Sequence, residues 1–289
     1  MLVMKTACLA GRREVPWNPS FTPNKDEKYC FALALSGGGS FGAYETGVVW
    51  GLLHYGDPDS YRWDVFTGVS AGSINAGMMS VWPKGSEVEM SENISHMVTV
   101  TTSDDTIASW DDHFLVPGPV EGYLYHAGLY DNSPMESYLN DYFANFTDIE
   151  KKLEISAVNV ETGEFKCFDE SITLKNLGRI IRASSSIPFA FPPTEFEGSL
   201  YMDGGTVWNI NIDSAIDKCL ELVDDEEHVV LDIAITETED LPTLNSTGHS
   251  FSNFWRKHQI RKQYKVMDDI VEFARSRPNV NYRHFFSPS

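Results

Sequence analysis

The stretch LALSGGGSFGAYETGVV, residues 33–49, ends an apolar run with three consecutive glycines and then enters a helical pattern. Glycine costs backbone entropy and adds no side-chain packing, so three in a row predict a place where bare backbone is needed. The preceding run, 29–35, has the length and continuous apolarity of a strand buried on both faces. Residues 43–55 have helical spacing and end at the Gly-Asp-Pro turn signal of 56–58.

A second strand and helix follow closely, at 64–69 and 71–81. Strand, helix, strand and helix in succession predict a parallel sheet with right-handed crossovers, and therefore an α/β fold with a mostly parallel sheet. Further strands are predicted at 153–160, 164–168, 200–202 and 228–236, and further helices at 134–143, 174–183 and 254–276.

The chain has 289 residues, of which 42% are hydrophobic, enough for one large domain. Residues 1–28 are predicted to be an irregular lead-in and 29–236 the main domain. Within it, 83–150 is the least regular part and suggests a cap or insert. We expect the polar loop and helix of 237–289 to pack on the same domain.

The formal net charge of −20 argues against a nucleic-acid partner. No apolar segment is long enough to span a bilayer, and the N-terminus is a poor secretory signal. The four cysteines lack a C-x-x-C pair, so neither disulfides nor a cysteine zinc site is expected, and a reducing compartment fits. These features predict a cytoplasmic protein or one peripheral to membranes.

One segment, FWRKHQIRKQYK at 254–265, has five cations and no acid. Two interpretations stay open, a solvated helix face or a contact with an anionic membrane or acidic partner.

The chemistry is suggested first by Gly68-Val69-Ser70-Ala71-Gly72, a G-x-S-x-G pattern between a predicted strand and helix. Such a turn strains the serine backbone and projects its hydroxyl near a helix N-terminus, whose dipole favours developing negative charge. We interpret Ser70 as a nucleophile, with flanking Gly68 and Gly72 avoiding collisions. The alternative is a helix-capping serine in a tight turn.

A serine nucleophile needs donors for the oxyanion that forms during attack on an ester. Gly37, Gly38 and Gly39 are predicted to offer backbone N–H groups for it, and Gly42 completes the glycine-rich loop. The alternative is phosphate binding, because the glycines formally match G-x-G-x-x-G. That match lacks the acidic residue expected at the end of a second strand.

The nucleophile also needs a base. Asp203, followed by Gly204 and Gly205 at a predicted strand end, is the strongest candidate, with an ordinary Asp-Gly turn as the alternative. None of the eight histidines lies in a motif, and His228 and His249 are the candidates for a triad.

Four blocks together resemble the patatin-like phospholipase family: SGGGSFGAYETGV (36–48), GVSAGSINA (68–76), IIRASSSIPFAFPP (180–193) and YMDGG (201–205). The resemblance implies an α/β/α sandwich, a Ser70–Asp203 dyad, and hydrolysis of lipid acyl esters without calcium or any other cofactor. The implied partner is a lipid substrate at a membrane or lipid-droplet surface.

The chain departs from the family pattern at two positions. Ser36 stands where many members have aspartate, and Phe41 where many have arginine or lysine. The backbone donors remain, so activity is still expected. The apolar stretch 187–192 suggests a wall for an acyl chain, or ordinary core.

Three other functions stay open. An acyltransferase would use the same dyad with an alcohol in place of water. A triad esterase would need His228 or His249. A non-catalytic lipid- or protein-binding module would keep only the fold. The early position of the G-x-S-x-G strand, next to the glycine-loop strand, disfavours the triad esterase.

Overall fold

The computed structural model describes residues 15, 17–110, 119, 122, 126–238 and 250–288. Within these residues an eight-stranded sheet has the order β5-β6-β3-β2-β1-β7-β8, with β4 paired to β3. The strands are β1 (Cys30–Leu35), β2 (Val65–Val69), β3 (Lys152–Asn159), β4 (Phe165–Asp169), β5 (Thr194–Phe196), β6 (Ser199–Asp203), β7 (Val229–Ala234) and β8 (Asn281–Phe286).

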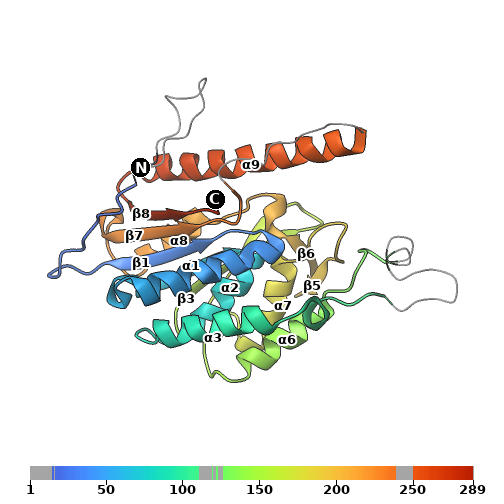
Figure 1. Cartoon of the computed structure of the whole chain (residues 1–289), viewed down its shortest axis with the longest axis horizontal. Helices are drawn as coiled ribbons and strands as arrows, with labels where there is room; N and C mark the ends of the chain where they lie inside the picture. Colours follow the sequence, from blue (N-terminus) through green and yellow to red (C-terminus); the bar gives the residue numbers. More distant parts are fainter. Residues whose placement is uncertain are drawn as a thin grey trace.

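The central strands β3, β2, β1, β7 and β8 are parallel, whereas β4, β5 and β6 are antiparallel additions around β3 and at one edge. Helices cover both faces of the sheet (Figure 1), which confirms the α/β class with a mostly parallel sheet. The helices are α1 (Gly42–Tyr55), α2 (Ala71–Ser80), α3 (Glu87–Val100), α4 (Ser103–Thr106), α6 (Ser133–Phe143), α7 (Leu174–Ser184), α8 (Ile212–Leu220) and α9 (Ser250–Ser276), with 3-10 turns at Gly39–Phe41, Pro58–Tyr61, Gly204–Thr206 and Glu226–His228.

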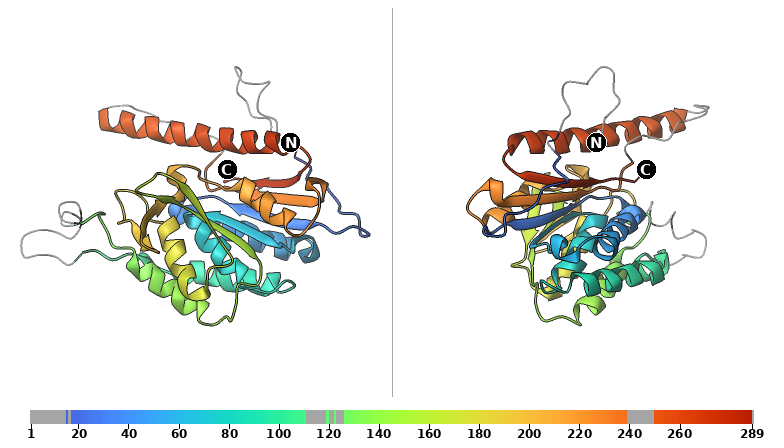
Figure 2. Two further views of the ribbon diagram at one scale, coloured as in Figure 1. Left: turned by 180° about the vertical axis from the view of Figure 1, so that it is seen from behind. Right: turned by 60° about the vertical axis from the view of Figure 1, so that its left-hand side comes forward.

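The strand β1 shows why a continuous apolar run suits the centre of this sheet. Leu33 and Leu35 pack into the core on the side of α1, α2, α3, α6 and α7, whereas Ala32 and Ala34 pack into a second core beneath α8 and α9. Because successive side chains of a strand point to opposite faces, a strand between two helical layers has no exposed face. The two layers are seen in Figure 2.

The predicted strands and helices are found with ends shifted by a few residues, and α3, α4, α8, β5 and β8 are additional elements. The helices α3 and α6, within the predicted insert, bury Met90, Ile94 and Leu139 in the same core as α1. Residues 111–118, 120–121 and 123–125 lie outside the described residues, so a cap over the site stays a prediction. No helix of the described part is long and apolar enough to cross a membrane.

One expectation was wrong. Cys30 of β1 and Cys219 of α8 form a disulfide with Cα atoms 5.4 Å apart, across a sequence separation of 189 residues. Spacing along the chain did not reveal this pair, because the sheet and α8 bring the two cysteines together only in the folded protein. Cys167 is a free thiol, and burial raises its pKa to about 11.

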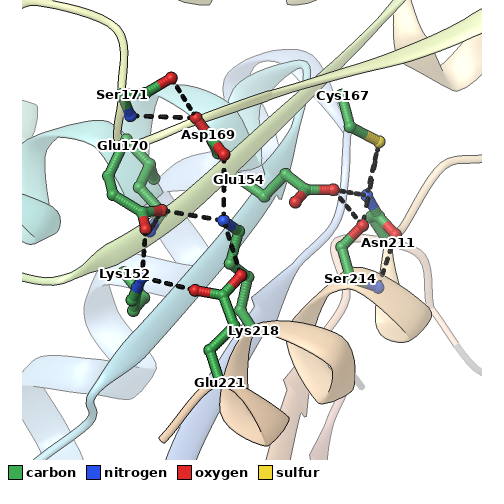
Figure 3. Close-up of polar contacts among 11 residues, drawn as sticks. Lys152, Glu154, Cys167, Asp169, Glu170, Ser171, Asn211, Ser214, Lys218 and Glu221 are labelled. Atoms are coloured by element: carbon green, nitrogen blue, oxygen red, sulfur yellow. Dashed lines mark hydrogen bonds and ion pairs between the residues drawn. The ribbon is translucent and has the colours of Figure 1, made fainter.

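A polar cluster attaches α8 to β3 and β4 (Figure 3). The Nζ of Lys218 lies 3.1 Å from Asp169 Oδ2, 3.3 Å from Glu170 Oε2 and 3.1 Å from Glu221 Oε1. Lys152 joins the same acids, at 2.6 Å from Glu170. Burial opposes the charge of Lys218, but the hydrogen bonds to its acidic partners raise its pKa. The acidic partners therefore keep the Lys218 ammonium charged between α8 and β4.

The first residue before α8 has a separate anchoring role. Asn211 accepts a hydrogen bond from the N–H of Ser214 at 3.2 Å and donates to the Ser156 hydroxyl of β3 at 2.8 Å. Its carbonyl accepts from the Thr67 hydroxyl of β2 at 2.8 Å. The segment that follows β6 is thereby fixed to the two strands that support Ser70.

Candidate active site

Ser70 lies at the junction of β2 and α2 with φ 53° and ψ −122°. A positive φ is uncommon for any residue with a side chain, and such strain persists only where the surrounding structure enforces it. The turn is pressed against β1: a Cβ on Gly72 would lie 2.4 Å from the Leu35 carbonyl oxygen, and one on Gly68 would lie 2.3 Å from the Gly72 oxygen. The close approach of the main chain therefore leaves no room for a side chain at Gly68 or Gly72.

The hydroxyl of Ser70 donates to Asp203 Oδ2 at 2.6 Å, and both residues are 5% exposed. The sheet register explains this meeting. Along β3, Ser156 pairs with Val69 at the end of β2, and the next residue, Ala157, pairs with Asp203 at the end of β6. The pairing of β6 with β3 thus begins one residue after the pairing of β2 with β3 ends. The side chains of Ser70 and Asp203 therefore lie at neighbouring positions.

The other oxygen of Asp203 is also held, since Oδ1 accepts the N–H of Gly205 at 2.7 Å. A Cβ on Gly205 would lie 2.6 Å from Asn209 Oδ1, and one on Gly204 would lie 2.5 Å from the Ser156 oxygen, so the turn is closely packed. Burial raises the pKa of Asp203 to about 6, although the hydrogen bonds from Ser70 and Gly205 act in the opposite direction. A carboxylate with this pKa is ionised at neutral pH and more basic than an ordinary aspartate.

Three serines fix the main chain of Ser70. The Ser184 hydroxyl accepts the Ser70 N–H at 2.9 Å and donates to the Ser156 carbonyl at 2.7 Å. The hydroxyls of Ser185 and Ser73 donate to the Ser70 carbonyl at 3.1 Å and 2.6 Å. Both main-chain groups of the strained residue are therefore satisfied, as buried backbone requires.

The glycine loop lies against Ser70: a Cβ on Gly37 would be 2.9 Å from Ser70 Cβ. The N–H of Gly37 donates to the Asn209 carbonyl at 2.9 Å, so it is not the open donor that the sequence predicted. No hydrogen bond among the described residues uses the N–H of Gly38 or Gly39. Gly39 has φ +59°, and a Cβ on Gly38 would be 1.9 Å from Thr236 Oγ1, so neither position suits a larger residue.

A buried acid, Glu45, binds the main chain just before the glycine loop. Glu45 of α1 is fully buried, and its oxygens accept the Ser36 N–H at 2.8 Å and Asn75 Nδ2 at 2.9 Å. Burial raises the pKa of Glu45 well above its usual value, although the hydrogen bonds from Asn75 and Ser36 act in the opposite direction. Asn75 also donates to the Gly42 carbonyl at 2.9 Å, which ties α2 to the first residue of α1.

Other predicted residues lie apart from the Ser70 hydroxyl. His228 precedes β7, at the amino end of the parallel strands, where its ring lies 3.7 Å from Glu27. His249 lies outside the described residues. In the stretch 187–192, Ile187 and Phe189 are exposed, so this loop is not ordinary core. Among the described residues, no three histidine, cysteine or acidic side chains gather as metal ligands.

Several supporting residues were missed from the sequence. Asn209 lies in no motif, and its importance comes from Gly37, 172 residues away along the chain. Glu45 belongs to the quoted block 36–48, but nothing in that block assigned it a role. Ser184 does belong to one of the quoted family blocks, and the run of three serines there was the available signal.

Comparisons of sequence find curated relatives that match most of this chain. Lysophospholipase NTE1 of Debaryomyces hansenii is 24% identical over 276 residues, which is 86% of this chain and 16% of that protein. The uncharacterized protein R571 of Acanthamoeba polyphaga mimivirus is 29% identical over 213 residues, covering 69% of this chain and 67% of that protein. The chain thus spans only a small part of the length of the NTE1 proteins it matches.

Among solved structures, the crystal structure of VipD from Legionella pneumophila is similar with a TM-score of 0.40 and 12% identity, covering 80% of this chain and 52% of that chain. A family model described as patatin-like phospholipase matches residues 33–216. Because this match covers most of the chain and contains both Ser70 and Asp203, the chain belongs to the patatin-like phospholipase family.

Proposed function

We propose that the chain hydrolyses carboxylic acyl esters of phospholipids or other glycerolipids through Ser70 and Asp203. The observation that carries this proposal is the 2.6 Å hydrogen bond from the strained Ser70 to the buried Asp203. The membership in a phospholipase family and the lysophospholipase names of the NTE1 relatives support a lipid ester as the substrate.

The first half of the reaction forms an acyl-serine. Ser70 Oγ attacks the ester carbonyl carbon while Asp203 Oδ2 takes the hydroxyl proton, and the carbonyl oxygen becomes an oxyanion. The N–H groups of Gly38 and Gly39 are the proposed donors for that oxyanion, and a preorganised donor is worth about 3 kcal/mol in such a transition state. The carbon–oxygen bond to the alcohol then breaks, and Asp203 returns the proton to the leaving alcohol.

The second half releases the fatty acid. Asp203 takes a proton from water, whose oxygen attacks the acyl carbon, and the same loop holds the second oxyanion. Breakdown of this intermediate releases the carboxylic acid and returns a proton to Ser70 Oγ. The raised pKa of Asp203, about 6, makes it a better base than an ordinary aspartate while it stays ionised at neutral pH.

The test measures fatty-acid release from phosphatidylcholine and lysophosphatidylcholine, together with labelling by a fluorophosphonate. Ser70→Ala and Asp203→Asn should each lower release by at least 10³-fold, on the order of the loss seen when a nucleophile or its base is removed. Ser80→Ala is the matched control, because the buried hydroxyl of Ser80 donates to Gly77 within its own helix, α2. Wild-type release by Ser70→Ala, or a label on another residue, would refute the proposal. Added alcohol acceptors show whether acyl transfer competes with hydrolysis.

A further inference from the structure

The N-terminal half of α9 is basic, and none of its described side chains belongs to the core. The buried side chains of α9 begin at Gln263 and belong to its second half: Gln263, Val266, Met267, Ile270, Val271 and Ala274. Before Gln263, the described side chains of the helix are exposed or half-buried. In Figures 1 and 2 this half of α9 extends past the carboxyl ends of β1 and β7.

The basic segment 254–265 ends beside residues that hold the glycine loop. Lys262 Nζ lies 2.9 Å from Glu237 Oε1, and the same oxygen accepts Asn209 Nδ2 at 2.8 Å. Asn209 Nδ2 also donates to the Gly37 carbonyl at 2.7 Å. Lys265 donates to the carbonyl of Val207, four residues after Asp203. Two contacts therefore connect α9 to the edge of the sheet that carries Ser70.

Two aromatic side chains are exposed on loops at this same edge. Phe41 and Phe189 are each 66% exposed. Phe41 stands between the glycine loop and α1, and Phe189 follows the serines that hold the Ser70 main chain. Phe189 has φ 75°, a strained value for a bulky residue.

The charge of the basic half contrasts with the rest of the chain. Five of the 22 lysines and arginines lie within 254–265, with no acid among them, in a chain of net charge −20. Lys257, Arg261 and Lys265 are exposed at i, i+4 and i+8, along one side of the helix. A cationic strip beside exposed aromatic rings is complementary to an anionic lipid surface, where cations meet headgroups and rings enter the interface.

We propose that the first half of α9, together with Phe41 and Phe189, docks the chain on an anionic phospholipid bilayer with the Ser70 edge facing the lipid. We call these residues the docking surface. The proposal rests on the proposed function for its purpose, because a lipid ester must leave the bilayer to reach Ser70.

The first experiment measures co-flotation with vesicles of phosphatidylcholine alone or with 30% phosphatidylserine, using the Ser70→Ala protein so that the lipid stays intact. We expect binding to the anionic vesicles that weakens from 50 to 300 mM salt, because salt screens exposed charges. Lys257→Glu with Arg261→Glu should reduce it by at least about tenfold, since each cation near such a surface contributes about fivefold.

The matched control is Lys25→Glu with Lys175→Glu, which makes the same charge change at exposed residues. Lys25 precedes β1 and Lys175 lies at the start of α7, so both belong to the amino-end edge of the sheet. This control should bind as the parent does. Equal loss in both double variants, or equal binding to neutral and anionic vesicles, would overturn the proposal.

The aromatic part has its own pair of variants. Phe189→Ser should weaken binding several-fold at every salt concentration, whereas Tyr55→Ser should not, although Tyr55 is 84% exposed, at the opposite end of α1 from Phe41. Hydrolysis of a short-chain soluble ester by the Lys257→Glu, Arg261→Glu enzyme with Ser70 intact should equal that of wild type. If the Ser70→Ala protein with its docking surface intact does not bind anionic vesicles, although wild type hydrolyses the soluble ester, docking alone is refuted. Soluble-ester hydrolysis that survives Ser70→Ala refutes the proposed function.

Discussion

Asn209 and Gly37 hold each other by two hydrogen bonds: the Gly37 N–H donates to the Asn209 carbonyl at 2.9 Å, and Asn209 Nδ2 donates to the Gly37 carbonyl at 2.7 Å. This pair joins the glycine loop to the segment after Asp203. The position of the proposed oxyanion donors thus depends on a residue outside the glycine loop.

Asn209→Ala tests that dependence. The loop loses its side-chain partner, and the Gly37 carbonyl is left without this donor, so we expect kcat to fall about 10- to 100-fold with a smaller change in KM. The free energy of unfolding should fall by about 1–2 kcal/mol. Asn279→Ala, at an exposed asparagine, is the control for kinetics and urea unfolding. An unchanged kcat in Asn209→Ala would show that the loop holds its shape without this partner.

The pH dependence of kcat/KM on a soluble ester should report Asp203. Burial raises its pKa to about 6, and only the ionised carboxylate accepts the Ser70 proton. Activity is therefore expected to fall tenfold per pH unit below about pH 6 and to level off above it. A midpoint near 4, the usual range of aspartate, would contradict the role of a buried base.

Asp203→Asn should stabilise the fold while it abolishes activity. The folded pKa, about 6, exceeds the ordinary value of 3.8, so the contribution of Asp203 to stability is greatest below 3.8 and is lost as the pH rises through 6. Asparagine removes the buried charge and can still accept from Gly205 and donate to Ser70 Oγ. At pH 7.5 we expect the free energy of unfolding to rise by on the order of 1–3 kcal/mol, with little gain at pH 4.

Urea unfolding of this variant at the two pH values provides the measurement, with Asp26→Asn at an exposed aspartate as the control. A variant less stable than wild type at pH 7.5 would show that the ionised carboxylate is held favourably after all.

Ser184→Ala should weaken both stability and activity. It removes the acceptor of the Ser70 N–H, leaving a buried donor unsatisfied, at a cost of about 1–3 kcal/mol. The strained turn then loses one of its restraints, so the rate of fluorophosphonate labelling at Ser70 should fall. Ser80→Ala removes an equally buried hydroxyl that bonds only to Gly77 in its own helix, and should cost less. Equal effects of the two variants would show that Ser184 supports the Ser70 turn no more than any other buried serine.

The disulfide gives a prediction about stability alone. Cys219→Ala should lower the free energy of unfolding by about 2–5 kcal/mol, because the bond between Cys30 and Cys219 closes a very long loop in the unfolded chain. Dithiothreitol should lower the Tm of wild type and leave that of Cys219→Ala unchanged. A Tm of wild type that does not respond to the reductant under unfolding conditions would contradict the bond.

Much of this architecture was predictable from local sequence. Continuous apolar runs at β1 and β7, the glycines after β1, and the elbow around Ser70 indicate a parallel sheet with the two loops on adjacent strands, and β1 and β2 do pair in parallel. The short antiparallel strands β5 and β6 and the helix α3 have weaker patterns, and the contacts that stabilise them come from neighbours distant in the chain.

The sequence by itself determined the α/β class, the family, and the residue types of the Ser70 elbow and the Asp203 turn, because local patterns carry these features. The tertiary structure alone decided that Gly37 is bonded to Asn209, that Ser184 holds the Ser70 N–H, and that Cys30 meets Cys219. These partners are more than 100 residues apart, and the register of β3 and the packing of helices on both faces of the sheet set their distances.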